Sequence, residues 1–256
     1  LYDGTDSHTV GGWTSASQTR DSSKDGTNSG ATTGQTGKLG NAWDFDGSND
    51  YVQTPSKFDF LHDGTGSTIA FWINPDTVGD NYIILNSMYA SSGSGGGTDI
   101  TFKTGGTIRS NYITSSNSWF TSCETPSGLS TGVWSHVVIS HGNNECKIYV
   151  DNSLVDTASF TNPFTGTAGG NLKIGEHSTD AGNYNRHDGK LDQVLFYDAV
   201  LSASDVTALY NSGSGTATPS TTNLIAHYDF EQSGDLENQI YESGTGTMFS
   251  FENTSG

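Results

Sequence analysis

Short apolar runs that return about every ten residues constrain this chain more than any other feature. Gly, Asn, Asp and Ser bound each run, and these residues favour turns. Runs of this length and spacing, with no long helical pattern between them, predict an all-β sandwich or barrel. The expected strands are residues 42–46, 51–54, 67–73, 82–86, 99–103, 107–113, 119–123, 133–141, 146–150, 172–176 and 191–197.

Two segments depart from simple alternation. Residues 67–73 are almost continuously apolar, which favours a strand buried on both faces. Residues 202–210 carry a helical pattern, with Ser202 as the N-cap, Asp205 at the third position and Val206, Leu209 and Tyr210 on one face. The sequence therefore predicts two sheets and one short helix near the C-terminal end.

The charge excludes some partners. The formal net charge is −18, and the ten Lys and Arg residues form no cluster. Phosphate binding requires clustered cations, so neither nucleic acid nor an anionic membrane surface is an expected partner. No apolar run approaches the ~20 residues of a membrane-spanning helix, so membrane insertion is not expected either.

Cys123 and Cys146 are the two cysteines of the chain. A cysteine pair in a Ser- and Thr-rich, Lys-poor chain fits an oxidising compartment, which favours a disulfide. Two buried free thiols are the alternative, and the sequence leaves the choice open because pairing depends on geometry.

Several segments together resemble the laminin G-like domains of the concanavalin A-like jelly-roll superfamily. The order and spacing of these segments carry the resemblance, which implies a two-sheet antiparallel jelly roll. The segments are GNAWDFDGSNDYV at 40–52, STIAFWI at 67–73, GVWSHVV at 132–138, KIYVD at 147–151 and GKLDQVLFY at 189–197.

The chain divides into three parts on this basis. Residues 1–213 form the laminin G-like domain, and residues 214–222, which lack large apolar side chains, form a linker. Residues 222–231 resemble the first strand of such a domain, and residues 1–4 resemble the end of that strand. Residues 223–256 therefore begin a second repeat, fold back on the same chain, or serve as a strand donated to a neighbouring copy.

Catalysis is not expected. Jelly-roll glucanases carry a Glu-x-Asp-x-x-Glu pattern, and Glu124, Glu145 and Glu176 all lack it. No Gly-x-Ser-x-Gly nucleophile motif occurs.

A structural calcium ion is implied by the resemblance. It assigns Asp192 as the side-chain ligand, with carbonyl oxygens from Gly47 and the region of Asp3. Oxygen ligands of this kind suit calcium. A cap on neighbouring backbone is the alternative role for Asp192. A second possible metal loop begins at Asp21, with oxygens at Asp21, Ser23 and Asp25 before Gly26, although an ordinary turn accounts for the same pattern.

Glycan binding would need exposed aromatic and polar side chains in the loops. Trp119, Tyr184 and His187 are the candidates. Our main functional hypothesis is a non-catalytic, extracellular structural or adhesion module of a cell-surface or virion assembly, with copies of itself or other surface proteins as partners and strand donation as a route to polymers. A calcium-dependent, lectin-like carbohydrate-binding module is the alternative, and a polysaccharide-degrading enzyme is a third.

Overall fold

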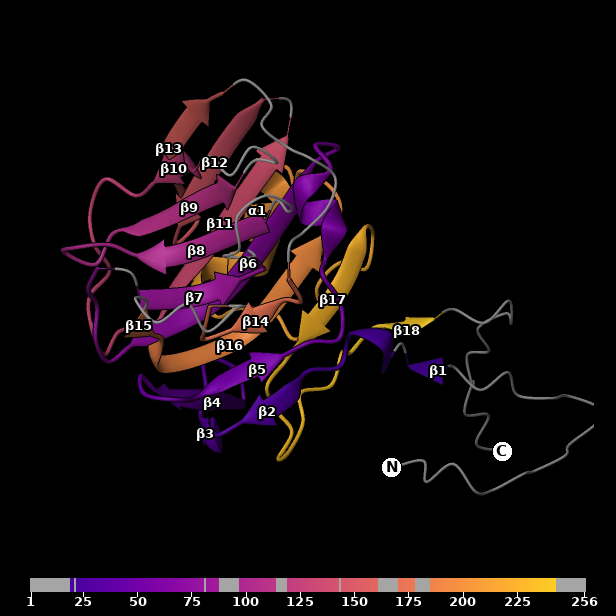
Figure 1. Cartoon of the computed structure of the whole chain (residues 1–256). Coiled ribbons are helices and arrows are strands. Elements are labelled where there is room, and N and C mark those ends of the chain that lie inside the picture. The colour runs from indigo at the N-terminus through magenta and orange to yellow at the C-terminus, as the bar shows by residue number, and fades with distance from the viewer. Residues whose placement is uncertain are drawn as a thin grey trace, which may run out of the picture.

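The computed structural model describes residues 19–20, 22–80, 82–87, 97–113, 119–142, 144–160, 170–177 and 185–242. Most of its strands form two packed sheets (Figure 1). In sheet I the order is β10-β9-β8-β7-β14-β5-β2, and in sheet II it is β13-β12-β11-β6-β16-β4-β3. The predicted antiparallel sandwich with one short helix is confirmed.

The strands of sheet I are β10 (Trp119–Glu124), β9 (Ile108–Ile113), β8 (Gly97–Phe102), β7 (Tyr82–Asn86), β14 (Lys173–Ile174), β5 (Tyr51–Gln53) and β2 (Thr27–Ser29), with β15 (Asn185–Arg186) beside β7. Those of sheet II are β13 (Ser153–Ser159), β12 (Glu145–Val150), β11 (Ser135–Gly142), β6 (Ser67–Pro75), β16 (Asp188–Tyr197), β4 (Asn41–Asp46) and β3 (Thr32–Thr36), with β17 (Leu224–Tyr228) beside β16. A separate small sheet pairs β1 (Thr19–Arg20) with β18 (Tyr241–Glu242). The two-residue strand β15 runs parallel to β7, in contrast to the antiparallel pairing expected throughout.

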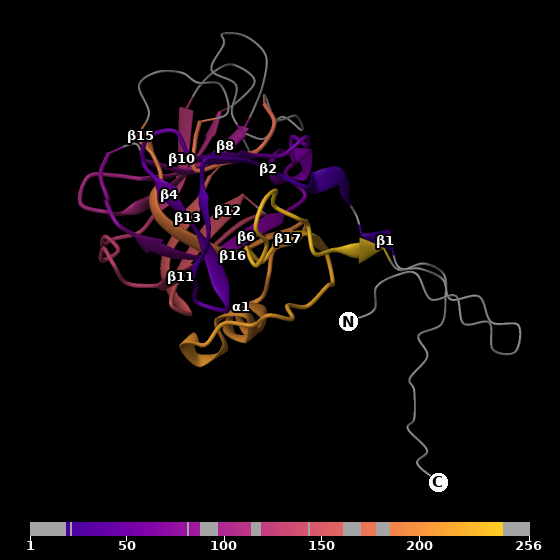
Figure 2. The same cartoon turned by 90° about the horizontal axis from the view of Figure 1, so that it is seen from below.

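The main core lies between the two sheets, where alternate side chains of each strand point inward. In sheet II the strand β6 is buried on both faces, as its sequence predicts. Ile69, Phe71 and Ile73 face the main core, and Ala70 belongs to a second apolar cluster with Val206 and Leu209 of helix α1 (Ala203–Tyr210). Figure 2 shows α1 on the outer side of sheet II, away from sheet I.

Helix α1 begins as predicted. Ser202 Oγ accepts the Asp205 N–H at 3.3 Å, and Asp205 Oδ2 accepts the Ser202 N–H at 2.9 Å, which completes a capping box. Three 3₁₀ segments, η1 (Ser22–Lys24), η2 (Asp59–His62) and η3 (Asn211–Gly213), complete the described helices. Within the described residues, no helix combines the length and apolar character needed to cross a membrane.

A disulfide joins the two sheets. It links Cys123 of β10 to Cys146 of β12, with their Cα atoms 5.9 Å apart. Of the two states left open by the sequence, the structure therefore has the bridged one.

The segment after the linker pairs within the chain. Strand β17 lies antiparallel to the C-terminal half of β16, with Val194 opposite Tyr228, while β4 pairs with the N-terminal half of the same strand. Tyr228, Phe230 and Leu236 are fully buried in the main core. Within the described part of this segment, residues 223–242, the chain folds back on itself, and residues 243–256 lie outside the described residues.

Candidate ligand groove

A polar groove lies on the outer face of sheet I, over its edge strand β2 and the neighbouring β5. Val52 of β5 points into the core, so Tyr51 and Gln53 on either side of it point outward. The groove has a volume of about 520 Å³, which is within the ~300–1,000 Å³ typical of ligand sites. It is lined by Asp25, Thr27, Asn28, Ser29, Tyr51, Gln53, Thr54, Pro55 and Asn171.

The chemistry of this lining suits a neutral polar ligand. Amide and hydroxyl groups supply both hydrogen-bond donors and acceptors, and Asp25 supplies a carboxylate. Tyr51 adds a half-buried aromatic ring, and Lys173 Nζ lies 4.4 Å from the centre of that ring. This cation–π contact restrains the ring, which leaves a defined aromatic surface within the groove.

A row of polar side chains continues from the groove across sheet I. Gln53, Lys173, Asn86, Asp99 and Asn111 are successive cross-strand partners on β5, β14, β7, β8 and β9. Partners in register point to the same face of a sheet, so this row shares the outer face with Gln53. Apart from Gln53, which is exposed, its members are buried.

Burial shapes the electrostatics of the row. Asn86 Nδ2 and Asn111 Nδ2 each donate to the Asp99 carboxylate at 3.2 Å, yet burial outweighs these bonds and raises the pKa of Asp99 to about 6. Lys173 Nζ donates to Glu176 Oε2 at 2.8 Å, and Arg186 Nε donates to Glu176 Oε1 at 2.6 Å. The two cations share one buried carboxylate, so Lys173 is ion-paired close to the groove, and the three side chains together carry a net charge of +1.

Of the predicted glycan residues, Trp119 and His187 lie away from the groove. Trp119 begins β10, at the edge of sheet I opposite to β2. Tyr184 lies outside the described residues. His187 is fully buried, 5.7 Å from the Phe45 ring, and burial lowers its pKa to about 3. A ring in that position cannot contact a ligand on the surface.

The predicted calcium ligands are not brought together among the described residues. Asp192 is fully buried; its Oδ2 accepts the Leu39 N–H at 2.8 Å, as a backbone cap does, and its buried Oδ1 has no hydrogen-bond partner. Gly47 lies beside Asp188, four positions earlier on β16, and Asp3 is outside the described residues. The partnerless oxygen fits a cation, but Gly47 is not placed to share one with it. Calcium binding at Asp192 stays a prediction.

Burial dominates the titration of Asp192. It raises the pKa of this carboxyl to about 7, although the backbone N–H groups of Leu39 and Lys38 act in the opposite direction. The nearby carboxylate of Glu231 raises the pKa further.

The second predicted metal loop is partly described. Asp21 lies outside the described residues, and Ser23 is exposed within η1. Asp25 Oδ1 accepts the Asn238 N–H at 2.9 Å, so this carboxylate oxygen already accepts a hydrogen bond from the backbone. Metal binding by this loop stays a prediction.

One further group has the spacing of metal ligands. Cys123, His141 and Cys146 each place one ligand atom within 4.8 Å of the others, and all three are buried. The two sulfurs are joined as a disulfide, so neither is available as the thiolate that binds a metal.

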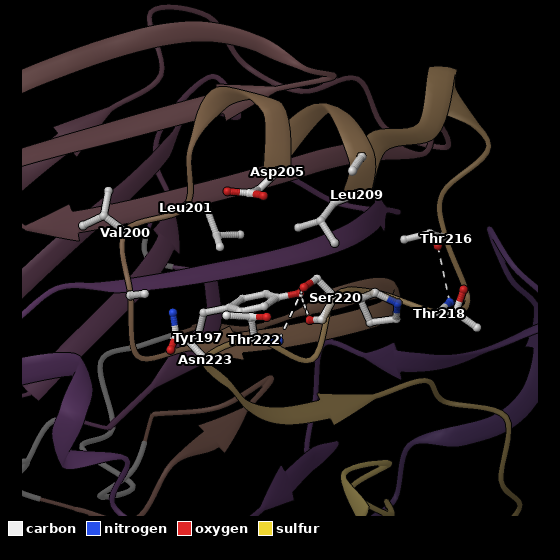
Figure 3. A pocket seen from close by; sticks show the side chains of 13 residues that line it. Tyr197, Val200, Leu201, Asp205, Leu209, Thr216, Thr218, Ser220, Thr222 and Asn223 are labelled. Carbon is white, nitrogen blue, oxygen red and sulfur yellow. Dashed lines mark hydrogen bonds between the residues drawn. The ribbon is translucent and has the colours of Figure 1, made fainter. Parts of the chain in front are cut away.

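A second cavity lies between α1 and the linker. Figure 3 shows Leu201 and Leu209 above the ring of Tyr197, whose hydroxyl donates to the Ser220 carbonyl at 3.3 Å. The cavity has a volume of about 200 Å³, which is below the usual range for ligand sites. We therefore assign it to the packing of α1 and the linker on sheet II.

Sequence reasoning missed the groove although it predicted one of its strands. Tyr51 and Gln53 alternate with Val52, and this period of two would have placed them on the outer face. The charged pair Lys173 and Glu176 within a predicted strand of a Lys-poor chain was a second available signal. Residues 25–29 contain no apolar pattern, and the oxygen-rich pattern that includes Asp25 pointed to a metal loop instead.

Comparisons with known proteins agree with the sandwich. No curated protein matches the chain. Solved structures do: domain 4 of AbnA, an extracellular arabinanase from Geobacillus stearothermophilus solved in complex with arabinotriose, has a TM-score of 0.54 at 18% identity, over 75% of this chain and 82% of that domain.

Two other structures match over smaller parts of their own length. The receptor-binding domain of the botulinum neurotoxin C/D mosaic serotype has a TM-score of 0.54 at 16% identity, over 72% of this chain and 45% of that one. Tailspike protein 2 of the Escherichia coli O157:H7 bacteriophage CAB120 has a TM-score of 0.56 at 13% identity, over 84% of this chain and 31% of the tailspike. At these identities the likeness shows a shared fold.

The family itself is identified from sequence. Residues 46–207, more than half of the chain, match Laminin_G_3, described as the Concanavalin A-like lectin/glucanases superfamily. This range contains β5, β14 and the polar row of sheet I, together with most of sheet II. The chain therefore belongs to the Laminin_G_3 family of concanavalin A-like domains.

Proposed function

We propose that this domain is a non-catalytic carbohydrate-binding module that binds a neutral oligosaccharide in the groove over β2 and β5. The observation that carries the proposal is the groove itself, because it combines an aromatic ring with amide and hydroxyl side chains on an outward sheet face. Sugars present hydroxyl groups that pair with such side chains, and apolar faces that stack on aromatic rings.

Charge favours a neutral ligand over an acidic one. The chain carries a net charge of −18, and Asp25 adds a carboxylate at the groove wall. Lys173, whose Nζ lies over the Tyr51 ring, already pairs with Glu176. An anionic sugar would therefore meet the repulsion of the chain's net negative charge, and the cation beside Tyr51 is buried and already ion-paired.

The structural neighbours support a binding role. One was solved with arabinotriose, one is a toxin's receptor-binding domain, and one is part of a phage tailspike. The disulfide and these neighbours support a secreted or surface location. The self-assembly hypothesis loses its main support, because the segment considered for donation pairs with β16 of its own chain.

The test is a titration of the isotope-labelled protein with arabinotriose and a panel of other neutral oligosaccharides. Amide chemical shifts locate the binding site, and calorimetry measures the affinity. We expect ligand-induced shifts at β2 and β5. Gln53→Ala should weaken binding about tenfold, because an exposed hydrogen-bonding group is lost from the groove.

Gln35→Ala is the matched control, since Gln35 lies on β3 of the other sheet. Shifts that map away from the groove, or equal losses in both variants, would contradict the proposal. Incubation with the same oligosaccharides should release no reducing ends, and release would instead favour an enzyme.

A further inference from the structure

One wall of the groove is built by a strand that is too short to hold its own position. Strand β2 has three residues, and on one side it pairs with β5. An isolated pairing of this length is marginal. The groove wall therefore depends on whatever holds β2 from its other side.

The arm, defined as residues 229–240 after β17, is in contact with that other side. It first crosses the end of sheet II, where Glu231 accepts the Asn41 N–H at 3.1 Å and the Gln232 carbonyl accepts Trp43 Nε1–H at 3.0 Å. It then reaches β2 and its preceding turn, and so connects the two sheets.

Four hydrogen bonds join the arm to the groove wall. Gly26 and Leu236 exchange two backbone bonds, at 2.8 and 2.7 Å. Asp235 Oδ1 accepts the Asn28 N–H at 3.0 Å, and the Asn238 N–H donates to Asp25 Oδ1 at 2.9 Å.

The packing at this junction is close. A Cβ atom on Gly26 would lie 2.4 Å from Val52 Cγ1 and 3.6 Å from Leu236 Cβ, so β5 and the arm enclose this position from two directions. Leu236 and Asn238 are fully buried, and Asn238 Oδ1 accepts the His227 N–H at 3.0 Å. The arm is thus anchored to β17 at the same place where it holds the wall.

We infer that the arm is a structural part of the ligand site, with Asp235 and Asn238 as positioning residues for Asn28 and Asp25. This inference rests on the proposed function. The arm and residues 25–29 both lie outside the family match of 46–207, whereas Tyr51, Gln53 and Asn171 lie inside it. The arm therefore holds the half of the groove that lies outside the family match.

The test compares three variants of the full chain. Asp235→Ala removes the acceptor of the Asn28 N–H, and Asp235→Asn retains an acceptor oxygen at the same position. Asp198→Ala is the control, because it removes an exposed carboxylate that lies beyond the end of β16, away from the arm. Hydrogen exchange of the Asn28 amide is measured without ligand, and oligosaccharide affinity is measured separately.

We expect Asp235→Ala to accelerate exchange at Asn28 about fivefold and to weaken oligosaccharide binding by a similar factor, since a hydrogen bond to a charged but exposed group is lost. Asp235→Asn should restore most of both, and Asp198→Ala should change neither. Unchanged exchange in Asp235→Ala would overturn the inference, as would faster exchange with unchanged affinity. Absence of binding by the wild-type protein would refute the proposed function, and the exchange measurement would still decide whether the arm holds the wall.

Discussion

The contribution of the segment after the linker is best tested at Phe230. This side chain is fully buried and meets Trp43 edge to face, with ring centres 5.4 Å apart and an interplanar angle of 80°. Truncation of a buried Phe to Ala costs about 3–5 kcal/mol, of which the aromatic pair accounts for about 1 kcal/mol. Phe230→Ala leaves the register of β17 with β16 intact, so the variant should fold and lose about this much stability.

Deletion of residues 223–256 should have a larger effect. It removes Tyr228, Phe230 and Leu236, all fully buried. At about 1.5–3 kcal/mol for each large side chain, the loss of roughly 5–9 kcal/mol approaches the total stability of an ordinary domain. The shortened chain should therefore be largely unfolded at room temperature.

Urea denaturation, monitored by tryptophan fluorescence, measures the loss of stability in both Phe230→Ala and the deletion variant. Leu154→Ala is the control, because Leu154 is 50% exposed and its truncation should cost less than about 0.5 kcal/mol. A loss below about 1 kcal/mol in Phe230→Ala, or a deletion variant that melts like the full chain, would refute the reasoning that this segment completes the core.

Three further predictions concern the buried His187, calcium binding at Asp192 and the disulfide. Burial lowers the pKa of His187 to about 3, so below about pH 6.5 the unfolded chain binds a proton that the folded chain does not. For this group, the free energy of unfolding therefore falls by about 1.4 kcal/mol for each unit by which the pH is lowered. His187→Leu should reduce the loss between pH 7 and pH 5 by about 2 kcal/mol in urea titrations, and an equal loss in both proteins would contradict this. If Asp192 binds calcium, a chelator should lower the melting temperature, and Asp192→Asn should reduce the response; an unchanged melting temperature would argue against the site. Alkylation without reductant should leave the mass unchanged because Cys123 and Cys146 are bridged. Reduction should lower the free energy of unfolding by about 3 kcal/mol, given the separation of 23 residues between the two cysteines. Two alkylated thiols in the untreated protein would reject the bridge.

The inner strands and the helix were predictable because their signals are local. A strand that packs between two layers needs apolar side chains, and β6, β11 and β16 carry them in consecutive runs at 69–73, 137–139 and 194–197. The capping box of Ser202 and Asp205 lies within four residues, so it is visible before any tertiary contact is known. Asp151 and Asn152 adopt the positive φ of a tight hairpin, and Asp and Asn tolerate this conformation, so this turn also depends on local residue types.

The edge strands β2, β3 and β13 were not predictable in this way. Strands β2 and β3 consist of Thr, Asn, Ser, Gly and Gln, and Leu154 of β13 is exposed. These segments are strands because a neighbour offers backbone hydrogen bonds, and that neighbour is distant in sequence. Their side chains carry no apolar pattern because solvent covers at least one face.

The sequence by itself determined the fold class, the inner strands and the helix, since burial and capping impose residue types at fixed local spacings. Only the tertiary structure decided the groove, because β2, β5 and Asn171 become neighbours through strand order and register. It also decided the partner of residues 224–228. Their apolar residues indicate a strand, but any exposed strand edge could accept it, and the choice of β16 depends on the burial of Tyr228, Phe230 and Leu236 in a core that forms from the whole chain.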